Sequence, residues 1–198
     1  MHKAIQTGPT MEPISLREAK DHLIVEHSED DMLIRQLVTA ARLHVEQRCN
    51  RVLMRQKWRI YQDYGLKDFK LEPFPVKEVE QIQYVDIDGA TQTVTSTVYS
   101  VDIPRQCVYE AYGQTWPGAR YQENSAWADV WAGEYNASAS PIDLTAGIPA
   151  DMKAVMLMLV DDLYANRGKQ IDGKLYKNET YDAMLAPFVI YENNGGIY

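Results

Sequence analysis

Residues 148–167 carry more apolar surface than one core-facing helical stripe requires, and this excess constrains the fold more than any other feature of the chain. The segment predicts a helix. Pro149 suits a first helical turn, and Asp151 places a negative charge at the positive end of the helix dipole. Arg167 and Gly168 are typical of a helix end.

The apolar residues of this helix divide into two sets. The first set has helical spacing and forms one face: Met152, Val155, Met156, Leu159, Val160, Leu163 and Tyr164. The second set lies off that face: Ala154, Leu157 and Met158. A helix that is apolar on most of its circumference is buried on more than one side, either in a large core or between subunits.

Size and composition indicate a folded protein. The chain has 198 residues, of which 45% are hydrophobic and 24% charged, so wholesale disorder is not expected. It has no run of about 18 uncharged apolar residues and no signal-peptide pattern, which predicts a cytosolic protein without a membrane segment. Cys49 and Cys107 belong to no metal-binding or disulfide pattern, and we expect buried thiols.

Charge is distributed unevenly around a net value of −8. Residues 84–145 contain eight acidic and two basic residues, whereas residues 42–59 contain six basic residues and one acidic residue. The arginines of the basic segment are the candidate basic patch: Arg42, Arg48, Arg51, Arg55 and Arg59. Two interpretations remain open: a solvated helix end, or a surface for an acidic partner or DNA phosphates.

Two helices are expected near the N-terminus. Ser15 and Glu18 have the spacing of a capping box, which predicts a helix over 16–23. Ser28 and the acids after it predict a second helix from about residue 29 to Val52. Its expected buried face is Leu33, Leu37, Ala40, Ala41, Val45, Cys49 and Val52.

The middle of the chain changes from helical to alternating periodicity. We predict strands at 58–64, 79–85, 91–101, 107–112 and 126–135. Asp88-Gly89 is a hairpin turn signal, so the strands are interpreted as a β-meander. A short helix over 181–185, stopped by Pro187, follows the long apolar helix.

This order of elements predicts an α+β chain in which the terminal helices pack as a small helical bundle around an inserted antiparallel β-sheet region. The expected divisions are a flexible N-terminal arm (1–13), N-terminal bundle helices (14–57), an inserted β region with its linker (58–147), C-terminal bundle helices (148–187) and an extended C-terminal tail (188–198).

No motif for chemistry is present. The four histidines fit no metal-ligand spacing, and phosphate-binding loops and nucleophile elbows are missing from the sequence. Asp86-Ile-Asp88-Gly89 resembles the start of a calcium loop but lacks the later ligands, so the hairpin interpretation is preferred. We expect no enzyme, no cofactor and no metal site.

A collinear set of short motifs resembles phage head-tail connector (adaptor) proteins of the gp6-like and phiE125 gp8-like kind. The N-terminal motifs are Glu12-Pro-Ile-Ser-Leu-Arg-Glu-Ala-Lys20, His22-Leu23, Glu29-Asp-Asp31, Leu37-Val-Thr-Ala-Ala41, Val45-Glu46 and Trp58. The β region adds Pro75-Val76, Tyr84-Val-Asp86, Asp88-Gly89, Tyr99, Trp116-Pro117 and Trp131-Ala-Gly133. The C-terminal motifs are Ile148-Pro-Ala-Asp-Met-Lys153, Tyr164-Ala-Asn-Arg167 and Met184-Leu-Ala-Pro187.

The resemblance implies a virion structural protein that assembles in the host cytoplasm and lies at the head-tail interface. It implies a homo-oligomeric ring, a dodecamer, below the portal protein. Such a ring extends the channel for double-stranded DNA and provides the attachment surface for the next connector, stopper or tail protein. Ala154, Leu157 and Met158 are the expected contact between ring neighbours. The expected portal-docking tail consists of Phe188, Val189, Ile190 and Tyr191.

The alternative function is a non-sequence-specific DNA-binding module that uses the arginines of residues 42–59.

Overall fold

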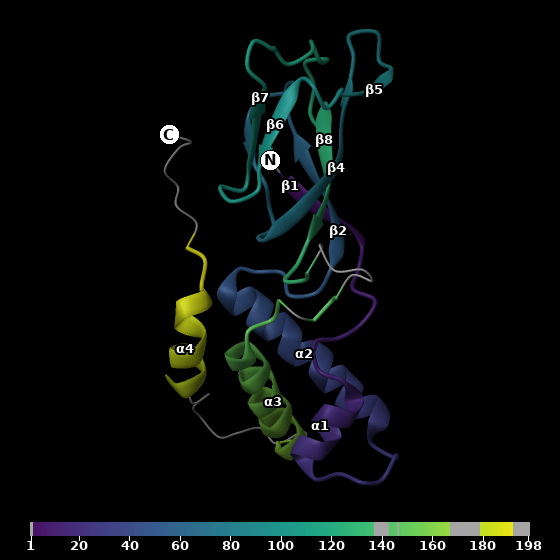
Figure 1. Cartoon of the computed structure of the whole chain (residues 1–198). Coiled ribbons are helices and arrows are strands. Elements are labelled where there is room, and N and C mark those ends of the chain that lie inside the picture. The colour runs from purple at the N-terminus through teal and green to yellow at the C-terminus, as the bar shows by residue number, and fades with distance from the viewer. Residues whose placement is uncertain (1, 137–142, 146, 167–178, 192–198) are drawn as a thin grey trace, which may run out of the picture. The chain divides into compact units, whose positions relative to one another are not determined.

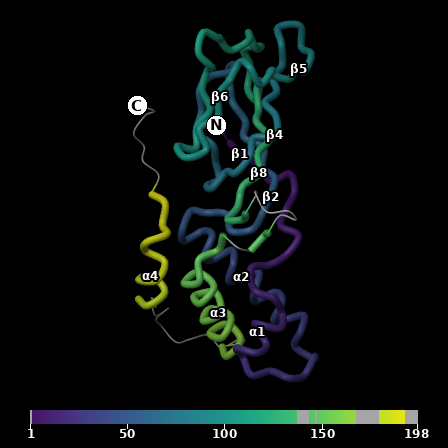
Figure 2. Tube along the Cα trace, viewed as in Figure 1, coloured from purple at the N-terminus to yellow at the C-terminus, as the bar shows by residue number. Residues whose placement is uncertain are grey.

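The computed structural model describes residues 2–136, 143–145, 147–166 and 179–191, and the chain forms two compact units. The sheet unit comprises Met1–Thr10 and Met54–Leu144, and the helical unit comprises Met11–Leu53 and Thr145–Tyr198. Figure 2 traces the path, which starts in the sheet unit, passes through two helices, returns to the strands and ends in helices. The α+β prediction is confirmed: the described residues contain four α-helices and two antiparallel sheets.

The larger sheet of the sheet unit has five strands in the order β1-β2-β8-β4-β5. These strands are β1 His2–Thr7, β2 Gln56–Gln62, β8 Ala126–Ala132, β4 Val76–Val85 and β5 Thr91–Thr93. The central strand β8 pairs with β2 on one side and with β4 on the other (Figure 1). Its small and branched residues on one face are fully buried, with Ile60 and Ile82 on the neighbouring strands.

A smaller sheet in the same unit has three strands in the order β3-β7-β6. Its strands are β3 Phe69–Lys70, β7 Cys107–Glu110 and β6 Tyr99–Asp102. Phe69 pairs with Val108, and both side chains are buried. The small sheet therefore contributes apolar side chains to the core of the sheet unit.

Three sequence predictions about this unit are wrong. The expected flexible arm contains β1, which pairs antiparallel with β2 along the edge of the sheet. The expected β-meander is interrupted, because β8 lies between β2 and β4 and the predicted strand 91–101 divides into β5 and β6 of different sheets. Residues 54–57, expected with the helices, also belong to the sheet unit.

The predicted hairpin between β4 and β5 is confirmed. Asp86 Oδ1 accepts hydrogen bonds from the backbone N–H groups of Asp88 and Ala90, and Gly89 has a φ of 90°. A hydrogen bond from the Gln92 side chain, together with these backbone bonds, holds the pKa of Asp86 below its usual value. The carboxylate therefore stabilises a turn, and the described residues contain no group of acids, histidines or cysteines arranged to hold a metal.

The helical unit begins with two N-terminal helices. Helix α1, Leu16–Leu23, has the predicted bounds and the predicted capping box: the Ser15 hydroxyl accepts from the Glu18 N–H, and the Glu18 carboxylate accepts from the Ser15 N–H. Helix α2, Asp31–Cys49, ends three residues earlier than expected because Asn50 adopts the left-handed conformation.

The buried face of α2 is rotated from the predicted one. Ala41, Val45 and Cys49 are buried as expected, but Ile34 and Val38 take the places assigned to Leu33 and Leu37. Leu33 and Leu37 are half-buried and Ala40 is exposed.

Helix α3, Ala150–Ala165, packs against α2, and α4, Glu179–Leu185, packs against α3 (Figure 1). The predicted apolar face of α3 is confirmed at Met152, Val155, Met156 and Val160, which are fully buried. Leu163 is exposed, contrary to the prediction. Helix α4 ends at Leu185, as predicted from Pro187, and begins two residues before the predicted start; a single 3-10 turn, Ala186–Phe188, follows it. No helix among the described residues has the length and apolar content needed to cross a membrane.

Candidate interaction surfaces

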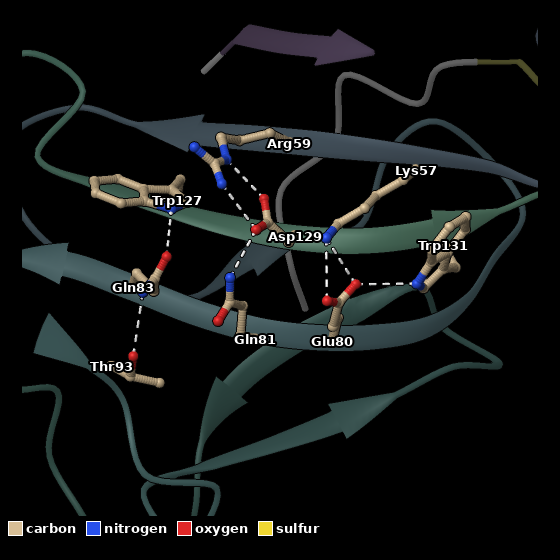
Figure 3. A network of polar contacts seen from close by, with 9 residues as sticks. All are labelled: Lys57, Arg59, Glu80, Gln81, Gln83, Thr93, Trp127, Asp129 and Trp131. Carbon is tan, nitrogen blue, oxygen red and sulfur yellow. Dashed lines mark hydrogen bonds and ion pairs between the residues drawn. The ribbon is translucent and has the colours of Figure 1, made fainter. Parts of the chain in front are cut away.

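The face of the large sheet opposite its apolar core carries a network of polar and aromatic side chains (Figure 3). At its centre, Arg59 of β2 donates two hydrogen bonds to Asp129 of β8, at 2.7 and 2.9 Å. Gln81 of β4 donates a third bond to the same carboxylate, at 2.9 Å. The antiparallel register places these three residues side by side across the sheet.

Two tryptophans of β8 flank Asp129 on this face. The indole N–H of Trp127 donates to Gln83, whose amide donates in turn to Thr93. The indole N–H of Trp131 donates to Glu80, which also pairs with Lys57 (Figure 3). Each tryptophan of this face is therefore connected to β4 by a hydrogen bond.

Arginine side chains lie over these aromatic rings. The Arg55 guanidinium lies 3.6 Å from the centroid of the Trp131 ring and 5.6 Å from that of Tyr135. Arg59 lies 5.3 Å from the Trp127 centroid. Stacked arginine and tryptophan are typical of protein interfaces, and this face has that composition.

The central carboxylate makes the sheet unit sensitive to acid. Asp129 is only 1% exposed; burial raises its pKa, but the bonds from Arg59 and Gln81 outweigh burial and hold the pKa below the usual value. Ionised Asp129 therefore stabilises the fold at pH values above about 4, the unfolded pKa, and this contribution is lost as the pH falls through the lower folded pKa.

We expect Asp129→Asn to lower the free energy of unfolding at pH 7 by about 1–2 kcal/mol, because Asn accepts fewer bonds and carries no charge. The difference between wild type and variant should shrink as the pH is lowered from 4 to 2. Chemical denaturation at each pH measures this difference in the free energy of unfolding. Asp88→Asn, at an exposed aspartate, is the control. A difference that is constant with pH would contradict this role of Asp129.

Arg42 of the candidate basic patch lies in a buried ion cluster of the helical unit. Its side chain bonds Glu12 at 2.7 Å and Glu46 at 2.8 Å, and the residue is 5% exposed. Glu46 also accepts the Leu53 N–H, and Glu12 accepts the Thr39 hydroxyl. Burial lowers the pKa of Arg42, but its two carboxylate partners outweigh burial and raise it. The cluster therefore joins the chain before α1 to α2 and to the chain after α2.

The remaining arginines do not complete a cationic surface. Arg48 pairs with Asp182 of α4 at 2.7 Å, and Arg51 is half-buried. Carboxylates thus neutralise Arg42, Arg48 and Arg59, and the five arginines are divided between the two units. This arrangement does not favour the DNA-binding interpretation of the patch, since phosphate contacts need cations that are available to the ligand.

The three residues expected between subunits, Ala154, Leu157 and Met158, are half-buried and lie opposite the buried face of α3. Helix α4 lies beside this part of α3: the Tyr181 hydroxyl donates to the Met158 carbonyl at 3.5 Å and to the Asp162 carboxylate. Part of the excess apolar surface is therefore covered within the chain, and part remains accessible.

The described part of the expected tail is attached to α2. The Ile190 N–H donates to the Cys49 carbonyl at 2.9 Å, and Phe188, Val189 and Ile190 are half-buried. The expectation of an exposed extended tail is wrong for these three residues. Tyr191 is 77% exposed, and residues 192–198 lie outside the described part of the chain.

Sequence reasoning missed both polar clusters, although signals for them were present. Arg42 and Glu46 have the four-residue spacing of a helical ion pair. Trp127, Asp129 and Trp131 alternate along one strand, as do Lys57 and Arg59, so each set lies on one face. Only the strand order, with β8 beside β2, brings the two sets together.

No family model and no curated protein matches the chain. Solved structures do match. A chain of the structure described as "Neck of empty GTA particle computed with C6 symmetry" has a TM-score of 0.73 and 20% identity, and 99% of each chain is covered. A chain of "Virion of native gene transfer agent (GTA) particle" has a TM-score of 0.73 and 19% identity, and a chain of "Neck of native GTA particle computed with C12 symmetry" has 0.71 and 20%. Coverage is again 99% of each chain. The complete fold, with both units, is therefore shared with these particle proteins.

Proposed function

We propose that this chain is a structural head-tail connector of a phage-like particle and acts without catalysis. In this role it forms a homo-oligomeric ring of twelve copies beneath the portal protein, extends the channel for double-stranded DNA and offers the next connector, stopper or tail protein its attachment surface. The observation that carries the proposal is the structural match over 99% of both chains to chains of gene transfer agent necks.

Two further observations support the ring. One matching neck was computed with C12 symmetry and another with C6 symmetry, and six divides twelve. The helical unit also leaves apolar side chains exposed or half-buried on the outward sides of α2 and α3, as expected of a subunit with neighbours.

The proposal is tested by sedimentation with portal-bearing capsids that lack their own connector. We expect the purified protein to co-sediment with these capsids and to remain in the supernatant with capsids that lack the portal. Absence of a complex at protein concentrations that saturate binding in comparable assemblies would contradict the role. A monomeric free protein is compatible with it, because the portal then serves as the template for the ring.

The tail contributes to portal attachment in this proposal. Because Phe188, Val189 and Ile190 are held against the helical unit, Tyr191 is the described tail residue that is most exposed to a partner. We expect Tyr191→Ala to weaken co-sedimentation with portal-bearing capsids by about tenfold, the effect of an aromatic interface anchor, without changing the melting temperature. Tyr112→Ala, at a fully exposed tyrosine of the sheet unit, is the matched control. Unchanged co-sedimentation of the Tyr191 variant would exclude this contact.

A further inference from the structure

We propose that neighbouring copies in the ring meet through two different helix faces, the exposed strip of α2 on one copy and the outward face of α3 on the next. This inference rests on the connector role proposed above and identifies both sides of the subunit contact. The partner is therefore a second copy of this chain.

The exposed strip of α2 lies opposite its buried face. It consists of Met32, Gln36, Ala40, Leu43 and Gln47, which are all exposed and are spaced three or four residues apart. Met32 is 75% exposed and Leu43 is 46% exposed. A 19-residue helix that presents methionine, alanine and leucine along its outer side has the pattern of a helix that packs against another helix.

The outward face of α3 offers a matching surface. Ala154, Leu157 and Met158 lie on it together with Asp161 and Ala165, at angles of about 100° per residue that place them opposite the buried Met152 and Met156. The side chain of Ala154 is small, which permits close approach of a second helix. Helix α4 lies beside Met158 and Asp162 and covers that part of the outward face. Among the described residues, the surface around Ala154, Leu157 and Asp161 is the part left for a neighbour.

Charge distinguishes the two faces and selects which of them meet. Arg35 is exposed beside the α2 strip, whereas Asp161 is exposed on the outward face of α3. An α2 strip against an α2 strip brings like charges together, and so does an α3 face against an α3 face. The mixed contact pairs arginine with aspartate and apolar residues with apolar residues.

A contact between two different faces is head-to-tail, and it gives a ring when the rotation between neighbours closes and an open filament when it does not. A contact between identical faces gives a closed dimer instead. The chemical difference between the α2 strip and the α3 face therefore favours the head-to-tail contact that a ring requires.

Cross-linking between single-cysteine variants tests the contact without disturbing the fold. Ala40→Cys and Ala154→Cys copies are mixed, assembled on portal-bearing capsids and treated with a short bismaleimide. We expect cross-linked dimers from the mixture and none above the wild-type background from either variant alone. Wild type controls for the native Cys49, which is buried, and for Cys107, which is half-buried. Cross-links from either variant alone, or none from a mixture that assembles, would overturn the inference.

A second test uses variants that block one face each. Leu43→Arg should reduce ring assembly about tenfold or more, and Leu157→Arg should do the same. Mixed together, the two blocked variants retain one functional contact and should form heterodimers but no rings. Ile87→Arg, at a residue of the sheet unit that is 76% exposed, should assemble as wild type does.

The possible failures are distinguishable. If wild type forms no ring on the capsids, the connector role fails and this inference fails with it. If wild type forms rings and folded Leu43→Arg protein does so equally well, the inference alone fails.

Discussion

Replacing Arg42 with alanine is expected to lower the free energy of unfolding of the helical unit by about 3–5 kcal/mol. The substitution removes a buried cation and leaves the carboxylates of Glu12 and Glu46 without it. The Glu46 side chain is 11% exposed and the Glu12 side chain 27% exposed, so water replaces the lost contacts only in part. Thermal and urea denaturation, followed by circular dichroism at the helical signal, measure the loss.

Arg35→Ala provides the matched control, since Arg35 is exposed on the same helix. We expect it to change stability by less than about 0.5 kcal/mol. If Arg42→Ala were as stable as Arg35→Ala, the buried cluster would not hold the helical unit together. A Glu12→Gln variant should show an intermediate loss of stability, because the glutamine amide keeps the shape and one acceptor oxygen of the carboxylate but not the charge.

Gly133→Ala is expected to destabilise the sheet unit by about 2–4 kcal/mol, through backbone strain and a steric clash. Gly133 has a φ of 136°, where side chains are disfavoured. A Cβ atom on this residue would lie 2.6 Å from the backbone oxygen of Met54. Unlike the end of a flexible side chain, this backbone atom cannot shift away easily. The glycine of the Trp131-Ala-Gly133 motif is thus required because two backbone segments approach closely.

Gly118→Ala is the control for this substitution. A Cβ atom at Gly118 has no neighbour within 4 Å, so we expect no loss of stability and a small gain if the backbone accommodates alanine. Denaturation of both variants, followed by tryptophan fluorescence from Trp127 and Trp131 of the same unit, measures the difference. Equal stability of the two variants would contradict the close approach at Gly133.

Local signals predicted the helices better than the sheet. The capping box of Ser15 and Glu18 defined α1 to the residue, because a cap acts within one turn. The end of α2 was missed because Asn50 terminates it through a left-handed conformation that apolar spacing does not report. Periodicity located most strands, but their bounds and divisions depended on pairing partners distant in sequence.

The strand order and the candidate surfaces were not predictable from local patterns. Pairing of β8 with β2 joins residues about 70 positions apart, and β1 is a mostly exposed edge strand without strong apolar alternation. The arginine cluster looked basic in sequence because its partners are remote: Glu12, Asp129 and Asp182 each lie 30 or more residues from the arginine they pair with.

The excess apolar surface of α3 has two explanations in the structure, and only one of them could be predicted from the sequence. Helix α4 covers part of this surface through Tyr181 and its neighbours. This could not be predicted, because the sequence does not show where the last helix packs. The remaining surface, around Ala154 and Leu157, is the part assigned to a neighbouring copy.

Electron cryo-microscopy of portal-bearing capsids incubated with this protein tests the connector role most directly. We expect a ring of twelve copies on the portal, with the exposed strip of α2 from each copy against the outward face of α3 of the next. Capsids whose portal stays bare, or density for isolated copies bound elsewhere on the shell, would contradict it.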